Sequence, residues 1–175
     1  MKVRNFKEIK IFKLKKYKDI RGYFFENYNK NNNPKLPIFN QDNISFSKKP
    51  GTLRGIHFQK KPFQQGKLIS VISGSIQDIV IDIRKGSKNY GNYISILISS
   101  KNNKQVYIPP GFAHGFLTLE KNTLVLYKVS NVYNKNSEVS ILWNDKELNI
   151  KWKNKKNIVL SKKDKNGIGF KQIND

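Results

Sequence analysis

The sequence predicts an all-β protein, a jelly-roll β-sandwich with a few short helices. Short apolar runs with period-two alternation repeat through the middle of the chain, and Gly, Pro and Asn turns separate them. Helical periodicity is weak by comparison. The chain of 175 residues is long enough for a single domain, residues 1–175, that buries about 70% of its unfolded surface.

The clearest predicted strands form a hairpin. Residues 67–73 alternate along their length, and Gly74-Ser75 after them is typical of a hairpin turn. The return run over residues 76–83 places isoleucines at odd positions on one face and Asp78 and Asp82 on the other. Further runs of the same kind occupy residues 93–98, 104–108, 115–119 and 124–129.

Two short helices are expected outside these strands, one over residues 24–31 and one near the C-terminus. The polar tract over residues 29–33 ends at Pro34 and indicates a surface loop. No apolar run approaches about 18 residues, so no membrane-spanning helix is expected. The N-terminus lacks the apolar core of a signal peptide, and the chain has no cysteine for disulfides. A cytoplasmic protein without membrane contact is therefore expected.

The formal net charge of +22 raises the possibility of nucleic-acid binding. The lysines, however, are scattered among Asn and Ile along the whole chain, with no basic helix or stripe. We therefore interpret them as a solvated surface and expect no nucleic-acid partner. The positive electrostatic field that these lysines create would favour a small anionic substrate.

Arginine is rare among the 34 basic residues, since all except Arg4, Arg21, Arg54 and Arg84 are lysine. An arginine offers a planar fork of donors that lysine cannot imitate. Arg21 and Arg54 each precede a glycine, which lets a ligand approach the backbone closely. Phosphate contact is one explanation for both, and an ion pair within the fold is the other.

The two histidines of the chain lie in apolar, glycine-containing segments, residues 51–59 and 109–116. The segment around His114 resembles the second half of the cupin metal motif. The first half should offer two histidines one residue apart and then an acidic ligand, but it offers only His57, followed by Phe58. Metal sites usually need three or four ligands, so we expect a cupin-like fold without metal.

His57 then becomes a candidate general base, because imidazole titrates near neutral pH. A base needs an orienting partner, and both Asp82 and Asp164 are candidates. Lys67 enters a strand after Gln-Gly and could stabilise an oxyanion, while Tyr127 could donate a proton. Taken singly, each of these residues is equally typical of a core histidine, a surface lysine or an interior aromatic.

The order of the motifs is more specific than any single residue. The motifs are Asp19-Ile20-Arg21-Gly22 with Glu26, Gln41-Asp42-Asn43, residues 51–59, Gln65-Gly66-Lys67-Leu68, residues 80–84 and 108–116, Tyr127-Lys128, and residues 141–145 and 160–164. Together they resemble the dTDP-4-dehydrorhamnose 3,5-epimerase family, over about residues 5 to 165. The resemblance implies a cupin-like jelly roll, a homodimer, and no metal or organic cofactor.

The reaction implied by the resemblance inverts carbons 3 and 5 of a 4-keto-6-deoxy sugar linked to dTDP. The keto group acidifies the neighbouring carbons, and reprotonation of the enolate from the opposite face inverts each centre. The resemblance implies that His57 is the base, that Asp164 orients it, that Tyr127 is the acid and that Lys67 stabilises the enolate. Asp82 also matches a family position and stays a competing partner for His57.

Further residues match the family's ligand contacts: Arg21, Glu26, Gln41, Asp42, Asn43, Arg54, His114, Glu138 and Lys163. Relatives with this fold invert a single centre or act on other nucleotide sugars, such as GDP-heptoses. The alternative functions are therefore an epimerase of another nucleotide-linked 4-keto sugar and, more remotely, a non-catalytic nucleic-acid-binding sandwich.

Overall fold

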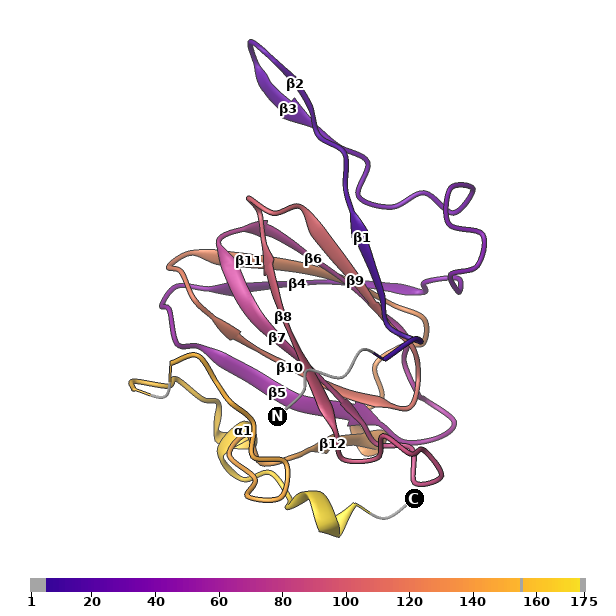
Figure 1. The fold of residues 1–175 in the computed structure, drawn as a ribbon, viewed down its shortest axis with the longest axis vertical. Coiled ribbons are helices and arrows are strands. Elements are labelled where there is room, and N and C mark those ends of the chain that lie inside the picture. Colours follow the sequence, from indigo (N-terminus) through magenta and orange to yellow (C-terminus); the bar gives the residue numbers. More distant parts are fainter. Residues whose placement is uncertain (1–5, 155, 174–175) are drawn as a thin grey trace.

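Two five-stranded antiparallel sheets make up the body of the computed structural model, which describes residues 6–154 and 156–173 (Figure 1). In pairing order, the first sheet contains β1 (Lys10–Lys13), β9 (Lys104–Ile108), β6 (Lys67–Ser73), β11 (Thr123–Val129) and β4 (Gln41–Ser47). The second contains β12 (Glu138–Ser140), β5 (Leu53–Gln59), β10 (Phe112–Thr118), β7 (Ser75–Asp82) and β8 (Tyr93–Ser99). The expected all-β jelly-roll architecture is confirmed.

The predicted strands agree with the observed ones to within a residue, except for β10. This strand was expected to begin at Gly115 and begins at Phe112. The earlier start follows from pairing with β7, where Phe112 and Ala113 lie opposite Asp82 and Ile81. Strands β1, β4, β5 and β12 of these sheets were not predicted, although β4 alternates between polar Asn43 and Ser45 and apolar Ile44 and Phe46.

The helix expected over residues 24–31 is wrong, because β3 (Gly22–Phe24) ends there and a loop follows. The Asn29 side chain accepts a hydrogen bond from the Asn31 amide at 2.9 Å and donates one to Glu26 at 3.0 Å. Such local bonds compete with helix formation. The helix expected near the C-terminus is present as α1 (Lys162–Lys165), and 3₁₀ turns lie at η1 (Lys135–Ser137) and η2 (Phe170–Gln172).

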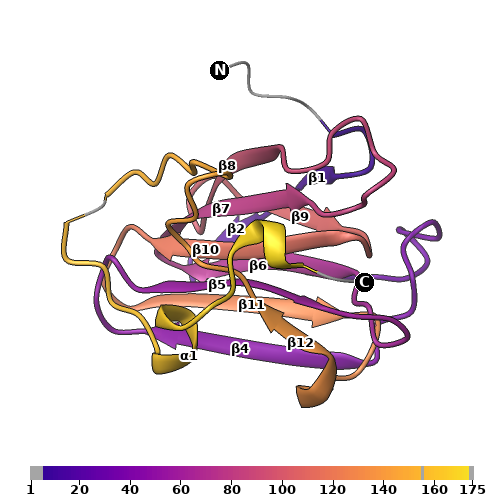
Figure 2. The ribbon, with the colours of Figure 1, turned by 90° about the horizontal axis from the view of Figure 1, so that it is seen from below.

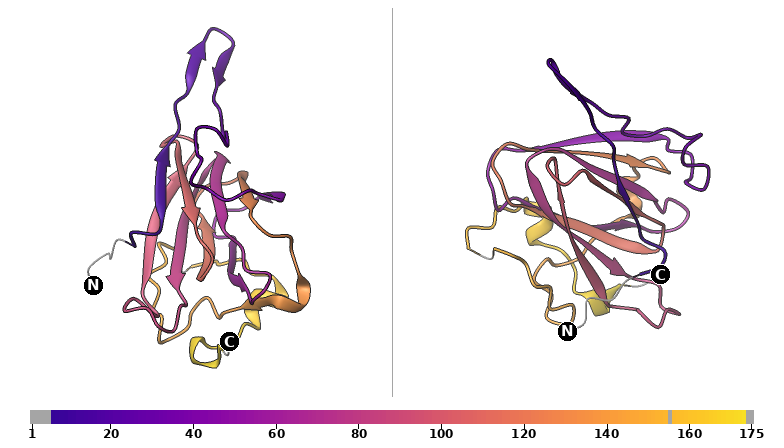
Figure 3. Two further views of the ribbon diagram at one scale, coloured as in Figure 1. Left: turned by 90° about the vertical axis from the view of Figure 1, so that its right-hand side faces the viewer. Right: turned by 45° about the horizontal axis from the view of Figure 1, so that its top comes forward.

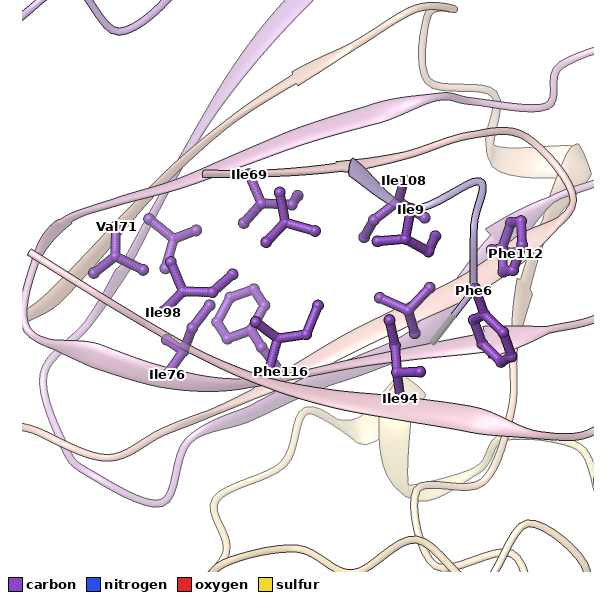
Figure 4. Close-up of a cluster of buried hydrophobic side chains, with 14 residues drawn as sticks. Phe6, Ile9, Ile69, Val71, Ile76, Ile94, Ile98, Ile108, Phe112 and Phe116 are labelled. Atoms are coloured by element: carbon purple, nitrogen blue, oxygen red, sulfur yellow. The ribbon is translucent and has the colours of Figure 1, made fainter. Parts of the chain in front are cut away.

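One hydrophobic cluster lies between the two sheets, as Figure 4 shows for side chains such as Ile69, Ile76 and Phe116. A second cluster covers the outer face of the second sheet and includes Ile79 and Ile81 of β7. Because successive side chains of a strand point to opposite faces, Asp78 lies on the inner face with Ile76.

The C-terminal segment, yellow in Figure 2, covers the second sheet and places α1 beside β5. It is attached by parallel bridges between Thr52 and Val159 and between Ile141 and Ile168. No helix within the described residues is long and apolar enough to cross a bilayer.

A hairpin of β2 (Tyr17–Asp19) and β3 projects away from the two sheets (Figures 1 and 3). Its apolar side chains are largely in solvent, and Ile20 and Phe24 have exposed fractions of 105% and 70%. Arg21 lies in the turn, where the positive φ of 133° at Gly22 suits glycine. Ile20 and Phe24 thus leave apolar surface of the hairpin in solvent, whereas Lys16 Nζ lies 4.1 Å from the centre of the Tyr23 ring.

Candidate active site

A cavity of about 670 Å³ is lined by strands of both sheets and by the segment that contains α1. The first sheet contributes residues from β4, β6 and β11, and the second contributes residues from β5, β10 and β12. The sequence-predicted residues in its lining are Gln41, Asn43, Arg54, His57, Lys67, His114, Tyr127, Glu138, Lys163 and Asp164.

His57 on β5 has Asp164 of α1 as its closest polar partner. The distance from His57 Nε2 to Asp164 Oδ1 is 2.6 Å, and the exposed fraction of the Asp164 side chain is 4%. Burial raises the pKa of Asp164, but the hydrogen bond and charge of His57 outweigh it, so the pKa is lowered overall. An ionised Asp164 can therefore hold the imidazole in one orientation.

Asp82, the other candidate partner, lies elsewhere. Its carboxylate accepts hydrogen bonds from the Arg84 guanidinium at 2.7 and 2.9 Å and from the Ser87 hydroxyl at 2.7 Å. Of the two carboxylates weighed from the sequence, only Asp164 contacts His57.

Glu138 on β12 stands at the other nitrogen of the His57 ring. Its Oε1 lies 4.0 Å from His57 Nδ1 and accepts a hydrogen bond from Lys163 Nζ at 2.8 Å. Its Oε2 accepts a bond from the Tyr133 hydroxyl, also at 2.8 Å. Burial raises the pKa of Glu138, but the bonds from Lys163 and Tyr133 lower it more. This leaves a fixed negative charge beside the imidazole.

Lys67 begins β6 and lines the cavity from the first sheet. Burial lowers the pKa of Lys67 to about 8, and the negative charges of Glu138 and Asp78 oppose that lowering. An ammonium group held out of water is a strong electrostatic partner for negative charge that develops in the cavity.

Tyr127 and His57 reach the cavity from opposite sheets, since Tyr127 is on β11 and His57 on β5. Burial raises the pKa of the Tyr127 phenol, while the charge of Arg54 lowers it in part. The phenol therefore holds its proton at neutral pH. The arrangement places an imidazole and a protonated phenol in one cavity, each on a strand of a different sheet.

Arg54 and His114 also line the cavity from the second sheet. Arg54 Nη2 donates a hydrogen bond to the Phe46 carbonyl at 2.9 Å, which leaves other guanidinium donors for a ligand. His114 Nε2 lies 2.6 Å from Asp78 Oδ1. Asp78 was not among the site residues expected from the sequence.

Three expected contact residues lie outside this cavity. Asp42 is on the outer face of β4, where its carboxylate pairs with Lys128 directly across the sheet at 2.8 Å. Arg21 is on the projecting hairpin, paired with Asp19, and its side chain has an exposed fraction of 84%. Glu26 follows the hairpin, is exposed and is bound by Asn29 and Asn32. Strand alternation explains Asp42, and the projection of the hairpin explains the other two.

Several lining residues were missed by sequence reasoning: Ile44, Ser45, Phe46, Gln65, Phe116, Tyr133 and Ser161. Ser45 could have been found from alternation, because it follows Gln41 and Asn43 at the same period along β4. Tyr133 lies in an irregular segment, and it is tied to the site by its hydroxyl bond to Glu138 and by the bond that its amide donates to Gln41 Oε1 at 2.9 Å.

The described residues contain no group of three or more His, Cys, Asp or Glu side chains that could hold a metal ion.

Comparisons with known proteins identify the family of the chain. The sequence profile of the dTDP-4-dehydrorhamnose 3,5-epimerase family matches residues 4–172. A relative of that name from Shigella flexneri is 41% identical over 167 residues, which covers 93% of this chain and 91% of the relative.

Solved structures give the same result. A dTDP-6-deoxy-D-glucose-3,5-epimerase from Legionella pneumophila, in complex with dTDP-4-keto-L-rhamnose, is 37% identical with a TM-score of 0.93 and covers 98% of this chain and 92% of its own. A dTDP-4-dehydrorhamnose 3,5-epimerase from Bacillus anthracis with TDP and PPi bound is 40% identical with a TM-score of 0.89, covering 96% and 98%. The resemblance seen in the motifs is thus confirmed, and the chain belongs to the dTDP-4-dehydrorhamnose 3,5-epimerase family.

Proposed function

We propose that this protein is an isomerase that inverts carbons 3 and 5 of a 4-keto-6-deoxy sugar linked to dTDP, giving dTDP-4-keto-L-rhamnose from the D-gluco substrate. The observation that carries the proposal is the position of His57 and Tyr127 on opposite sheets around one cavity. An inversion needs a proton to leave one face of a carbon and another to arrive on the opposite face.

His57 is the base in this proposal. Its Nε2 is occupied by Asp164, so Nδ1 is the nitrogen that takes the proton from carbon 3 or carbon 5. The imidazolium that results lies between the carboxylates of Asp164 and Glu138, which compensate its charge. Each general acid or base of this kind contributes about 10²–10⁴ in rate.

The electron pair left by the proton moves onto the keto oxygen as an enolate. In this proposal Lys67, which lines the cavity from the first sheet, is the cation that stabilises this oxygen. Donors fixed in advance toward a developing oxyanion contribute about 10²–10³ in rate. Tyr127 then gives its phenolic proton to the opposite face of the carbon, which completes the inversion.

Arg54 is assigned to the phosphate end of the substrate. Its guanidinium suits bidentate contact with phosphate oxygens, and the excess of positive charge over the chain favours an anionic ligand. Gln41, Asn43, Glu138 and Lys163 are the polar neighbours that we assign to the rest of the ligand.

A homodimer is part of the proposal, and two surfaces support it. The hairpin leaves Ile20 and Phe24 in solvent, and the edge strand β4 leaves Ile44 and Phe46 exposed at 72% and 55%. Exposed apolar patches and open sheet edges are typical of interfaces. Because Arg21 lies outside the cavity of its own chain, we propose that the hairpin brings it to the cavity of the partner.

Deuterium incorporation tests the reaction. With dTDP-4-keto-6-deoxyglucose in heavy water, we expect deuterium at carbons 3 and 5 and formation of the L-rhamno product. His57→Ala should abolish exchange at both carbons, whereas Tyr127→Phe should keep exchange and lose inversion. Lys128→Met, on β11 beside Tyr127 but paired with Asp42 outside the cavity, is the matched control and should behave as wild type.

The alternatives give different results in the same assay. Label at one carbon alone would make the protein a single-centre epimerase. Absence of exchange with the dTDP sugar, together with exchange on a GDP-linked 4-keto sugar, would change the nucleotide. Absence of exchange on both would refute the proposed function.

A further inference from the structure

A second imidazole–carboxylate pair lies in the cavity wall beside His57. The distance from His114 Nε2 to Asp78 Oδ1 is 2.6 Å, equal to the distance from His57 Nε2 to Asp164 Oδ1. His114 on β10 and His57 on β5 are directly paired across the second sheet, so the two pairs are neighbours. The function proposed above uses Asp164 but leaves Asp78 without a role.

Asp78 is fully buried on the inner face of β7, with an exposed side-chain fraction of 0%. Within the described residues its Oδ2 has no hydrogen-bond partner, and His114 is the only residue bonded to Oδ1. A buried ionisable pair contributes little to folding, because apolar residues of similar volume fill such a space without desolvating a charge. The geometry therefore indicates a role that depends on His114 rather than on packing.

The contact determines which ring nitrogen carries the proton. A carboxylate is an acceptor, so His114 must donate from Nε2–H, and a neutral ring then has a lone pair on Nδ1. In the described part of the chain, Nδ1 has no hydrogen-bond partner, and the ring lines the cavity. The cavity wall thus contains a hydrogen-bond acceptor with a fixed direction.

We propose that Asp78 is a positioning residue that holds the proton of His114 on Nε2, so that Nδ1 accepts a hydrogen bond from the C2 hydroxyl of the bound sugar. The choice of C2 rests on the proposed function, because carbon 2 keeps its configuration while carbons 3 and 5 invert. A fixed acceptor can hold that hydroxyl through both inversions, and it selects against sugars that lack it.

The imidazole tautomer can be measured directly in the free protein. Since the chain has two histidines, a ¹⁵N NMR spectrum of the ring nitrogens contains two residues, and His57→Gln assigns them. We expect wild-type His114 to carry its proton on Nε2. Asp78→Leu removes the acceptor at similar volume and should give a substantial Nδ1–H population.

Asp78→Asn serves as a second variant if the leucine variant does not fold, because its amide can either accept or donate and no longer imposes one tautomer. Asp82→Asn is the matched control. Asp82 is equally buried on the same face of β7 but is bound to Arg84, so the His114 tautomer should not change.

Kinetics give a second readout on the same variants. Wild type should have a higher kcat/KM for dTDP-4-keto-6-deoxyglucose than for its 2-deoxy analogue. In the Asp78 variants the ratio of these two kcat/KM values should be smaller by about tenfold, which is the effect of one hydrogen bond. Exchange catalysed by His57 should persist in them. An unchanged tautomer or an unchanged ratio in an active enzyme would overturn the role of Asp78, whereas an inactive wild type would refute the proposed function instead.

Discussion

His57 and Asp164 are 107 positions apart in the sequence, yet His57 Nε2 lies 2.6 Å from Asp164 Oδ1. The contact depends on the C-terminal segment, which returns over the second sheet and presents α1 to β5. Ser161 caps this helix by accepting a hydrogen bond from the Asp164 amide at 3.1 Å, which fixes the carboxylate in place. The orientation of the His57 ring is therefore set by the C-terminal segment.

Replacement of Asp164 by Asn should lower kcat by about 10²–10⁴-fold, because the imidazole loses the anion that fixes its tautomer and compensates its charge. KM should change little, since Asp164 is nearly buried and acts through His57. Initial rates of deuterium wash-in at carbons 3 and 5 measure the effect. Asp82→Asn is the control, and an equal loss in both variants would contradict the assignment.

The pH dependence of activity should report the protonation state of Lys67. Because burial lowers the pKa of Lys67 to about 8, the ammonium that holds the enolate is lost as the pH rises through that value. We expect kcat/KM to fall above pH 8, approaching tenfold per pH unit. Lys67→Met should be about 10²–10³-fold slower and should lack this alkaline limb. A limb near 10.5, the ordinary value for lysine, would exclude a desolvated ammonium.

The lowered pKa of Lys67 should also make the free energy of unfolding depend on pH, in the direction opposite to that of the activity. Between pH 8 and 10.5 the unfolded chain holds a proton on Lys67 that the folded chain has released. The contribution of Lys67 to the free energy of unfolding therefore rises with pH between pH 8 and 10.5. Denaturant midpoints of wild type and Lys67→Met, compared from pH 7 to 10.5, measure the difference.

Arg54→Lys should weaken substrate binding although the charge is kept. A lysine cannot reproduce a bidentate contact, so KM for the dTDP sugar should rise by about 10- to 100-fold with a smaller change in kcat. Arg84→Lys is the matched control, because Arg84 is bound to Asp82 and Glu8. It should lower stability and leave KM unchanged, and titration with dTDP gives the affinities directly.

The fold could be predicted where local pattern and tertiary environment agree. The hairpin of β6 and β7 has strong alternation and a glycine at the turn, where φ is +80° and a side chain would collide with Thr123. Strand β5 could not be recognised in this way, because the cavity-lining residues Arg54 and His57, together with Gly55, interrupt its apolar pattern. Two residues that line the cavity are thus among those that obscure the strand on which they lie.

The partner of His57 could not be chosen from local sequence for a similar reason. Alternation along β7 places Asp82 on the inner face, as expected, but Arg84 two residues later neutralises it at the strand end. Asp164 reaches His57 only through long-range packing of the C-terminal segment, which has no periodic signal. The resemblance to the family supplied what periodicity could not.

The proposed sharing of sites between two chains can be tested by mixing two inactive variants. Arg21→Ala should bind substrate poorly because the partner's cavity loses an arginine, and His57→Ala should lack the base. After the two are unfolded and refolded together, about half of the chains should be in mixed dimers. There, the cavity that keeps His57 receives the intact hairpin of the other chain, so activity should return.

The control for this mixture is His57→Ala refolded with Tyr127→Phe. Both changes lie in the cavity of their own chain, so each cavity of a mixed dimer still carries one of them, and inversion should stay absent. Recovery in the first mixture alone supports the exchange of hairpins between chains. Failure of the first mixture, with mixed dimers verified by mass, would show that Arg21 does not act across the interface, and a monomeric mass for wild type would exclude the shared site.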